Sequence, residues 1–310
     1  MQAVVDVWHE RAHAVPRRIV LADQGDQRAS LAAERLRNER LVEPIVIGED
    51  LATLDEVEDD RVHEVLDDAH VRAELSGRSF DPHDPLTIAA VLVGAGWADG
   101  AVGGASRPTS DVARAGLRVL GVAEGVSTVS SSFVFVLSDG RPIAFGDCGV
   151  VPLPDADQLA SIAIATATTF EGLIGEPAGV AMLSFSTKGS AEGPTIDVVR
   201  DATALVRDRA PELPVDGELQ FDAAWDAHIA SVKAPDSPVA GQANVFVFPN
   251  LDAANIAYKI TERLAGARAF GPLLQGLDGV LHDLSRGCSV DDIVNVAVIA
   301  SLQATARSAS

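Results

Sequence analysis

Short apolar runs alternate with helix-length segments along the N-terminal third of the chain. Residues 18–22, 44–48 and 98–102 form compact apolar runs, which predict buried strands. The stretches 27–40 and 85–96 have the length and residue pattern of helices. This strand–helix–strand order favours a parallel sheet that is covered by helices on both faces.

The rest of the chain continues the alternation after a predicted hairpin. Residues 130–137 and 142–145 are rich in β-branched and apolar side chains, and Asp139-Gly140 between them is typical of a hairpin turn. Further strands are expected at 180–185 and 245–248, and further helices near 156–173, 194–209, 222–232 and 290–305. The segment 49–83 is highly acidic and weakly patterned, which predicts a solvated surface segment with short helices. No repeat or Pro/Ser-rich linker marks a domain boundary.

Composition narrows the class of protein. The chain has 310 residues, enough for two domains, and 47% of them are hydrophobic, too many for a disordered protein. Acidic residues outnumber basic ones 45 to 24, a formal charge of −21, so we expect neither nucleic acid nor an anionic membrane as a partner. This charge still permits a small anionic ligand that is held by a few arginines.

The familiar site motifs are missing from the sequence. Two cysteines and seven scattered histidines provide no metal-ligand spacing, so no metal site is expected. No GxGxxG, Walker or GxSxG pattern is found, although glycines at 100–104 follow a predicted strand. No apolar stretch reaches the roughly 18 residues that span a bilayer, and the N-terminus lacks the layout of a signal peptide, so a cytoplasmic protein is expected.

Polar clusters at predicted strand ends are the candidate sites, because α/β proteins bind ligands there. After the strand at 180–185, Ser186, Thr187 and Lys188 suit either an anion-binding turn or a plain polar loop. A Pro-bracketed loop at 233–241 is a second cluster, and 283–292 is a third. In the third, Ser289 and Asp292 have the spacing of a capping box, which favours a structural role for Asp292 when the pattern is taken alone.

Six stretches carry a specific resemblance to a known family. They are residues 182–190, 216–224, 233–241, 245–251, 271–276 and 283–288. In this order they resemble the phosphate acetyl/butyryl transferase family, and within it the phosphate acetyltransferases (phosphotransacetylases). The similarity runs from about residue 17 to the C-terminus, with a weak patch near 50–83.

The resemblance implies a fold and a reaction. The family fold has two α/β domains with an interdomain cleft, similar to isocitrate and isopropylmalate dehydrogenases. Domain I would comprise 1–124 plus 275–310, and domain II 125–274. The family interconverts acetyl-CoA and phosphate with acetyl phosphate and CoA, typically as a homodimer. Coenzyme A is then a substrate, and no permanently bound cofactor is expected.

The family's functional residues fall on four positions of this chain. Its Ser-Arg-Gly-Cys segment matches Ser285 and Arg286, its proposed base matches Asp292, and a further arginine matches Arg114. The resemblance implies that Asp292 takes the thiol proton and that Ser285 donates to the tetrahedral oxyanion or the leaving phosphate. Arg286 and Arg114 would bind phosphate through their planar guanidinium groups.

The base assignment has to meet an energetic condition. Ordinary thiol and aspartate pKa values of ~8.5 and ~3.9 imply that full proton transfer costs ~6 kcal/mol. A position in the first helical turn also favours the carboxylate form. Asp292 therefore needs desolvation, or a thiolate and oxyanion stabilised by neighbouring donors such as Arg286. Cys288, in the same motif, is better explained as a packed thiol than as a nucleophile.

The chain departs from the family in two places. The stretch at 106–109 replaces the usual His or Asn and two threonines, so Arg107 is either an extra phosphate ligand or a residue that reshapes the acyl pocket. A family arginine upstream has no clear counterpart, although Arg72 and Arg78 lie nearby. Two alternatives therefore stay open: a phosphate acyltransferase for propionyl or butyryl groups, and a non-catalytic ligand-binding paralogue. A dehydrogenase is disfavoured because no nicotinamide-binding motif is present.

Overall fold

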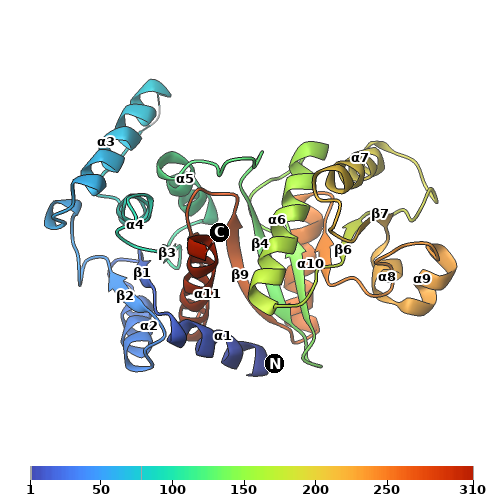
Figure 1. Ribbon diagram of the computed structural model, residues 1–310, viewed down its shortest axis with the longest axis horizontal. Coiled ribbons are helices and arrows are strands. Elements are labelled where there is room, and N and C mark those ends of the chain that lie inside the picture. Colours follow the sequence, from blue (N-terminus) through green and yellow to red (C-terminus); the bar gives the residue numbers. More distant parts are fainter. Residues whose placement is uncertain (1, 78, 310) are drawn as a thin grey trace. The chain divides into compact units, whose positions relative to one another are not determined.

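The structure, a computed structural model, describes residues 2–77 and 79–309 (Figure 1). It divides into two compact units. One unit comprises Gln2–Gly125 together with the chain from Phe270 onward, and the other comprises Val126–Ala269. We call them the terminal unit and the middle unit.

The terminal unit is built on a parallel four-stranded sheet. Its strand order is β10-β3-β1-β2. The strands are β1 (Arg18–Leu21), β2 (Glu43–Val46), β3 (Gly100–Gly103) and β10 (Leu281–Asp283). Because all four strands run in the same direction, their carboxyl ends share one edge of the sheet.

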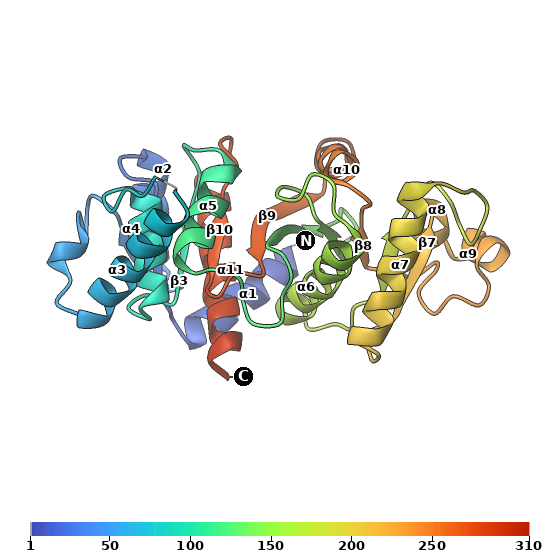
Figure 2. The ribbon, with the colours of Figure 1, turned by 90° about the horizontal axis from the view of Figure 1, so that it is seen from above.

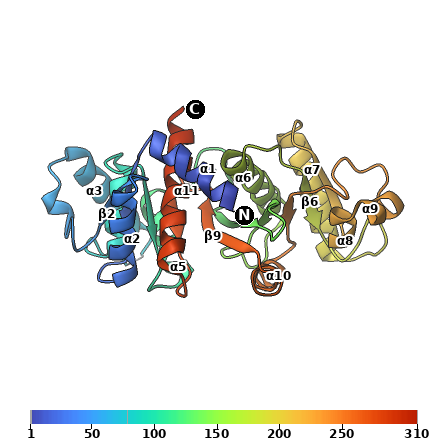
Figure 3. The ribbon, with the colours of Figure 1, turned by 90° about the horizontal axis from the view of Figure 1, so that it is seen from below.

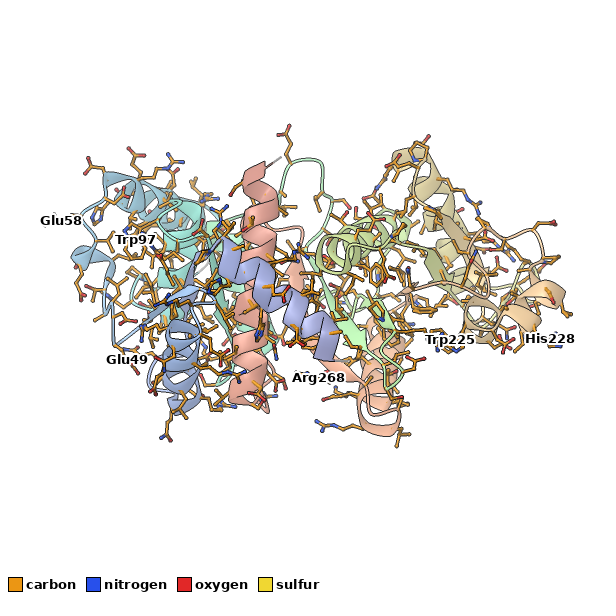
Figure 4. All side chains as sticks on the ribbon, turned by 60° about the horizontal axis from the view of Figure 1, so that its bottom comes forward. Glu49, Glu58, Trp97, Trp225, His228 and Arg268 are labelled. Carbon is orange, nitrogen blue, oxygen red and sulfur yellow. The ribbon has the colours of Figure 1, made fainter. Side chains whose placement is uncertain are left out.

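Helices cover both faces of this sheet. On one face α4 (Pro85–Gly94) packs on β3, α5 (Thr109–Val119) packs on β10, and α3 (Asp60–Leu75) packs on these two helices; Figure 2 shows this group from above. The other group is seen from below in Figure 3: α1 (Gln2–Ala14), α2 (Gln27–Asn38) and α11 (Val290–Ala309). At the opposite edge from the strands' carboxyl ends, the Arg18 guanidinium lies 4.7 Å from the centre of the Trp97 ring. Figure 4 labels Trp97 in this unit.

A mixed sheet has six strands in the order β7-β6-β8-β5-β4-β9; the first five lie in the middle unit, and β9 begins there with its first two residues, Arg268 and Ala269. The strands are β4 (Ser130–Val136), β5 (Pro142–Gly146), β6 (Val180–Leu183), β7 (Val215–Leu219), β8 (Val245–Val247) and β9 (Arg268–Gln275). The helices are α6 (Ala156–Ile174), α7 (Pro194–Arg209), α8 (Phe221–Trp225), α9 (Ala227–Lys233) and α10 (Leu251–Leu264). The core of the middle unit contains aromatic rings in stacked, tilted and edge-to-face pairs, among them Phe133, Phe135, Phe145 and Phe246.

Most of the predicted elements are confirmed, including the hairpin of β4 and β5. The α/β class is confirmed as well. Two predictions were wrong. The segment 49–83 contains the 16-residue helix α3 beside the short 3₁₀ turn Leu54–Glu56. The single helix expected at 222–232 is two helices, because the Asp226 side chain accepts from the amides of His228 and Ile229 and starts a second helix.

Candidate functional site

The loops after β1 and β3 are joined by a buried carboxylate. Asp23, two residues beyond β1, is only 4% exposed. Its side chain accepts the amide N–H groups of Gly104, Ala105 and Ser106, at 3.3, 3.1 and 3.2 Å. The Ser106 hydroxyl donates to it as well, at 3.1 Å. Asp23 therefore fixes the conformation of the loop that leads from β3 into α5.

One arginine ties the loop after β10 to these two loops. Arg28, in the first turn of α2, donates to the carbonyl oxygens of Arg286 and Cys288 at 3.1 and 2.9 Å. It also donates to the carbonyl oxygen of Ala105 at 2.8 Å and is paired with Asp26 at 2.6 Å. The sequence prediction missed Arg28 and Asp23. The only sequence signal for Asp23 is its position directly after a predicted strand, and Arg28 lies in the first turn of the helix predicted next.

Ser285 and Arg286 lie exposed in the loop after β10. The Gly287 amide donates to the Ser285 hydroxyl oxygen at 3.3 Å, which leaves the Ser285 proton free to be donated elsewhere. Within residues 2–77 and 79–309, the Arg286 guanidinium has no carboxylate partner. The backbone of this loop is held by Arg28, so the Arg286 side chain projects from a fixed base.

Asp292 makes the predicted capping box at the start of α11. Its Oδ2 accepts from the backbone N–H and the hydroxyl of Ser289, at 2.7 and 2.9 Å, and Ser289 Oγ accepts the Asp292 amide at 3.2 Å. No donor to Asp292 Oδ1 is found in the described part of the chain. The side chain is exposed, and the nearby Asp291 is paired with Arg35 instead. The capping role therefore occupies one carboxylate oxygen and leaves the other open.

Arg107 and Arg114 share a carboxylate at the start of α5. Arg107 lies between Asp84, at 2.5 Å, and Asp111, at 3.1 Å. Arg114 is paired with the other oxygen of Asp111 at 2.8 Å and is half-exposed. Burial opposes ionisation of Asp111, but the two guanidinium groups outweigh it and hold the pKa of Asp111 below its usual range. Arg107 is therefore neutralised by two acids, while Arg114 has one shared partner.

Two other predicted positions have structural contacts. Arg72, on α3, donates to the carbonyl oxygen of Val119 at 3.0 Å and ties α3 to the end of α5. Arg78 lies outside the described residues. Cys288 is buried, and burial raises the pKa of its thiol to about 11, which agrees with a packed thiol. Among the residues that the structure describes, no group of three or more His, Cys, Asp or Glu side chains could hold a metal ion.

The turn at Ser186, Thr187 and Lys188 lies in the middle unit and surrounds acidic and amide side chains. Ser186 donates to Glu218 at 2.9 Å, Thr187 donates to Gln220 at 3.2 Å, and the Lys188 ammonium is paired with Asp216. Asp216 and Glu218 are both buried, at 1% and 2% exposed. The turn has the predicted donors, and the anions that they hold in this structure are carboxylates of the chain itself.

Glu218 is the centre of that arrangement. It accepts from two nitrogens of Arg200 and from the Gly189 amide, all at 2.9 Å. Burial opposes the charged form, but these donors and Ser186 outweigh it and hold the pKa of Glu218 at about 2. Glu218 is therefore a carboxylate with a full set of donors at neutral pH.

Comparison with known proteins identifies the family. A family model described as phosphate acetyl/butaryl transferase matches residues 3–301. The chain is 44% identical to the phosphate acetyltransferase of Paracoccus denitrificans, over 96% of this chain and 98% of that one. Among solved structures, the phosphotransacetylases of Streptococcus pyogenes and Staphylococcus aureus superpose with TM-scores of 0.91 and 0.84, at 36% and 34% identity. The alignments cover 99% of both chains for the first and 98% of both for the second.

No helix among residues 2–77 and 79–309 has both the length and the apolar character that a membrane span needs. The resemblance noted from the sequence is confirmed, and the chain belongs to the phosphate acetyl/butyryl transferase family.

Proposed function

We propose that this protein is a phosphate acetyltransferase, which interconverts acetyl-CoA and phosphate with acetyl phosphate and CoA. Similarity over nearly the whole chain to proteins of that name supports the activity. The observation that carries the site is the exposed Arg286, for which no ion pair is found among residues 2–77 and 79–309. It follows Ser285 in the loop whose backbone Arg28 holds, and this loop leads to Asp292 at the start of α11. An anion is the natural partner of such a group.

The acetyl group passes directly between sulfur and phosphate oxygen in a ternary complex. In the direction of acetyl-CoA formation, the CoA thiol gives its proton to Asp292, and the sulfur attacks the carbonyl carbon of acetyl phosphate. The new C–S bond gives a tetrahedral oxyanion, to which Ser285 donates a hydrogen bond. The C–O bond to phosphate then breaks, the leaving phosphate takes the proton back from Asp292, and Arg286 binds its remaining negative charge. No covalent acyl-enzyme is needed.

The capping box specifies which atom of Asp292 takes the proton. Both Ser289 donors point to Oδ2, so the free oxygen, Oδ1, is the acceptor. Holding one oxygen also fixes the direction of the other, which a general base requires. The structural role that the sequence pattern favours and the proposed catalytic role are therefore compatible.

The arginines on α5 take different parts in this proposal. Arg114 has one shared carboxylate partner and is half-exposed, so it joins Arg286 on phosphate. Arg107 has two acidic partners, Asp84 and Asp111, which favours a role in shaping the site around Asp111 over direct phosphate binding. The predicted substrate contact of Ser186, Thr187 and Lys188 stays a prediction, which a Lys188 variant tests below.

Coenzyme A enters as a substrate, and we propose that no cofactor stays bound between turnovers. We further propose domains at 1–124 plus 275–310 and at 125–274, and a cytoplasmic homodimer.

The exposed apolar side chains of α10 support this helix as the dimer contact. Ile256, Ile260 and Leu264 recur every four residues and are 59%, 52% and 82% exposed. Light scattering on Ile260→Asp should then report a monomer, and an unchanged dimer would place the contact elsewhere.

The direct test is phosphate-dependent release of CoA thiol from acetyl-CoA. Parallel assays with propionyl-CoA and butyryl-CoA distinguish the acetyl enzyme from a longer-chain acyltransferase. A higher kcat/KM for butyryl-CoA than for acetyl-CoA would show that the butyryl group, and not the acetyl group, is the preferred substrate. Release with none of the three would support the non-catalytic paralogue.

A further inference from the structure

Asp283, a residue with no assigned role, lies at the junction of the site's loops. It is the last residue of β10, stands two positions before Ser285, and is 0% exposed. Thr109, the first residue of α5, donates to its Oδ2 at 2.5 Å. One buried carboxyl thus joins the strand that precedes Arg286 to the helix that carries Arg114.

The other carboxyl oxygen of Asp283, Oδ1, lies close to the backbone of the loop after β3. A Cβ on Gly104 would lie 2.2 Å from Oδ1, and Gly104 has a φ of +108°, so only glycine fits there. The register is held beside it, because the Leu284 amide donates to the Gly103 carbonyl oxygen at 2.9 Å. The carboxyl therefore acts as a spacer between β10, the loop after β3 and the first turn of α5.

The electrostatic surroundings of Asp283 favour its neutral form. Oδ1 has no hydrogen-bond partner within the described ranges. Burial raises the pKa of Asp283 to about 7 against the opposing effect of Thr109, and the charge of Asp23 adds to the increase. The adjacent His282 is turned to Gln303 of α11, with Nε2 and Oε1 2.5 Å apart, and burial lowers its pKa to about 4. Asp23 is thus the charged neighbour that acts on Asp283.

We propose that Asp283 is a positioning residue that sets the separation of Arg286 and Arg114 through its contacts with Thr109 and Gly104. The proposal rests on the proposed function, because those arginines are its phosphate ligands. Full burial excludes contact between Asp283 and substrate, so its effect is on geometry. Ionisation would place a second carboxylate beside Asp23 and weaken the arrangement as the pH rises.

Four variants test the proposal, each checked for a cooperative thermal unfolding transition. Asp283→Ala should raise the KM for phosphate about tenfold or more, while the KM for acetyl-CoA changes less than about threefold. Thr109→Val should also raise the KM for phosphate, and Thr109→Ser, which keeps the hydroxyl, should leave it unchanged. An unchanged phosphate KM in folded Asp283→Ala, or in Thr109→Val if the alanine variant does not fold, overturns the proposal.

Asp283→Asn gives a readout that a general packing role would not move. The asparagine side chain cannot ionise. The KM for phosphate of the wild type, divided by that of Asp283→Asn, should therefore rise between pH ~6 and ~8. Taking this ratio cancels the effect of the ionisation of phosphate itself. A flat ratio contradicts the proposal. If the wild type releases no CoA from any acyl-CoA, the proposed function fails separately. Calorimetric binding of inorganic phosphate to the same variants then decides the role of Asp283: weaker binding by Asp283→Ala supports it, and equal binding overturns it.

Discussion

Two buried carboxyls, one in each unit, lie in opposite surroundings. Glu218 in the middle unit has Arg200, Ser186 and the Gly189 amide as donors, and its pKa is held at about 2. Asp283 in the terminal unit has one hydroxyl donor, Thr109, and its pKa is raised to about 7. The first is a charged group with a full set of partners at neutral pH, and the second is about half protonated at pH 7.

The difference teaches where positive charge is available for a ligand. Around Glu218 and Asp216, the basic side chains of Lys188, Arg200 and Arg207 are paired with buried acids of the same unit. In the terminal unit, the buried Asp23 is satisfied by backbone amides, and no acid paired with Arg286 is found in the part of the chain that the structure describes. In a chain with a charge of −21, an arginine without such a partner is the group that an anionic substrate can use.

Removing that arginine should have the largest effect. We expect Arg286→Gln to lower kcat/KM for phosphate by about 10²–10³-fold, because a charge-assisted contact to phosphate and to the developing negative charge is lost. Steady-state assays of CoA release measure it. The matched control is Arg200→Gln in the middle unit, which should lower stability with kcat/KM within about threefold. Similar activity losses in both variants would break the contrast between the units.

The base is tested next. Asp292→Asn should lower kcat by about 10²-fold, since the amide cannot take the thiol proton. Asp291→Asn is the control on the same helical turn, because Asp291 is exposed and paired with Arg35. Near-normal turnover of Asp292→Asn with an unchanged pH profile would show that another group is the base.

In the middle unit the corresponding change should affect stability. Glu218→Gln removes a charged acceptor of several hydrogen bonds and should lower the free energy of unfolding by about 2–3 kcal/mol. The folded pKa of about 2 lies below the ordinary 4.5, so this stability is present above pH 4.5 and is lost as the pH falls toward 2. Urea unfolding should therefore show a gap between wild type and variant that closes on acidification. A gap independent of pH would contradict the assignment.

The smallest effect is expected at the turn that the sequence singled out. Lys188→Met should change the KM for phosphate and for CoA by less than about threefold, because the ammonium is paired with the buried Asp216. Thermal unfolding should occur at a lower temperature. A rise of more than about tenfold in either KM would establish the turn as part of the substrate site.

Motif matching could find residues whose neighbours in sequence form a pattern. Ser285, Arg286 and Asp292 lie within one short stretch, and the capping box around Ser289 follows from residue spacing. The strands β1 and β3 were also visible, as apolar runs ahead of polar residues.

The missed features depend on contacts between distant parts of the chain. Asp23 binds the amides of 104–106, and Asp283 meets Thr109 across 174 positions, so neither has a local signature. The ion pairs of Arg107 likewise decide its role only once α5 is placed near Asp84. Short elements such as the three-residue β10 were too brief to show periodicity.

The most direct test of the central claim is a phosphate titration of CoA release from acetyl-CoA by the wild type and Arg286→Gln. The account predicts saturable, phosphate-dependent release in the wild type and a kcat/KM for phosphate lower by about 10²–10³-fold in the variant. Equal phosphate dependence in the two proteins would contradict it.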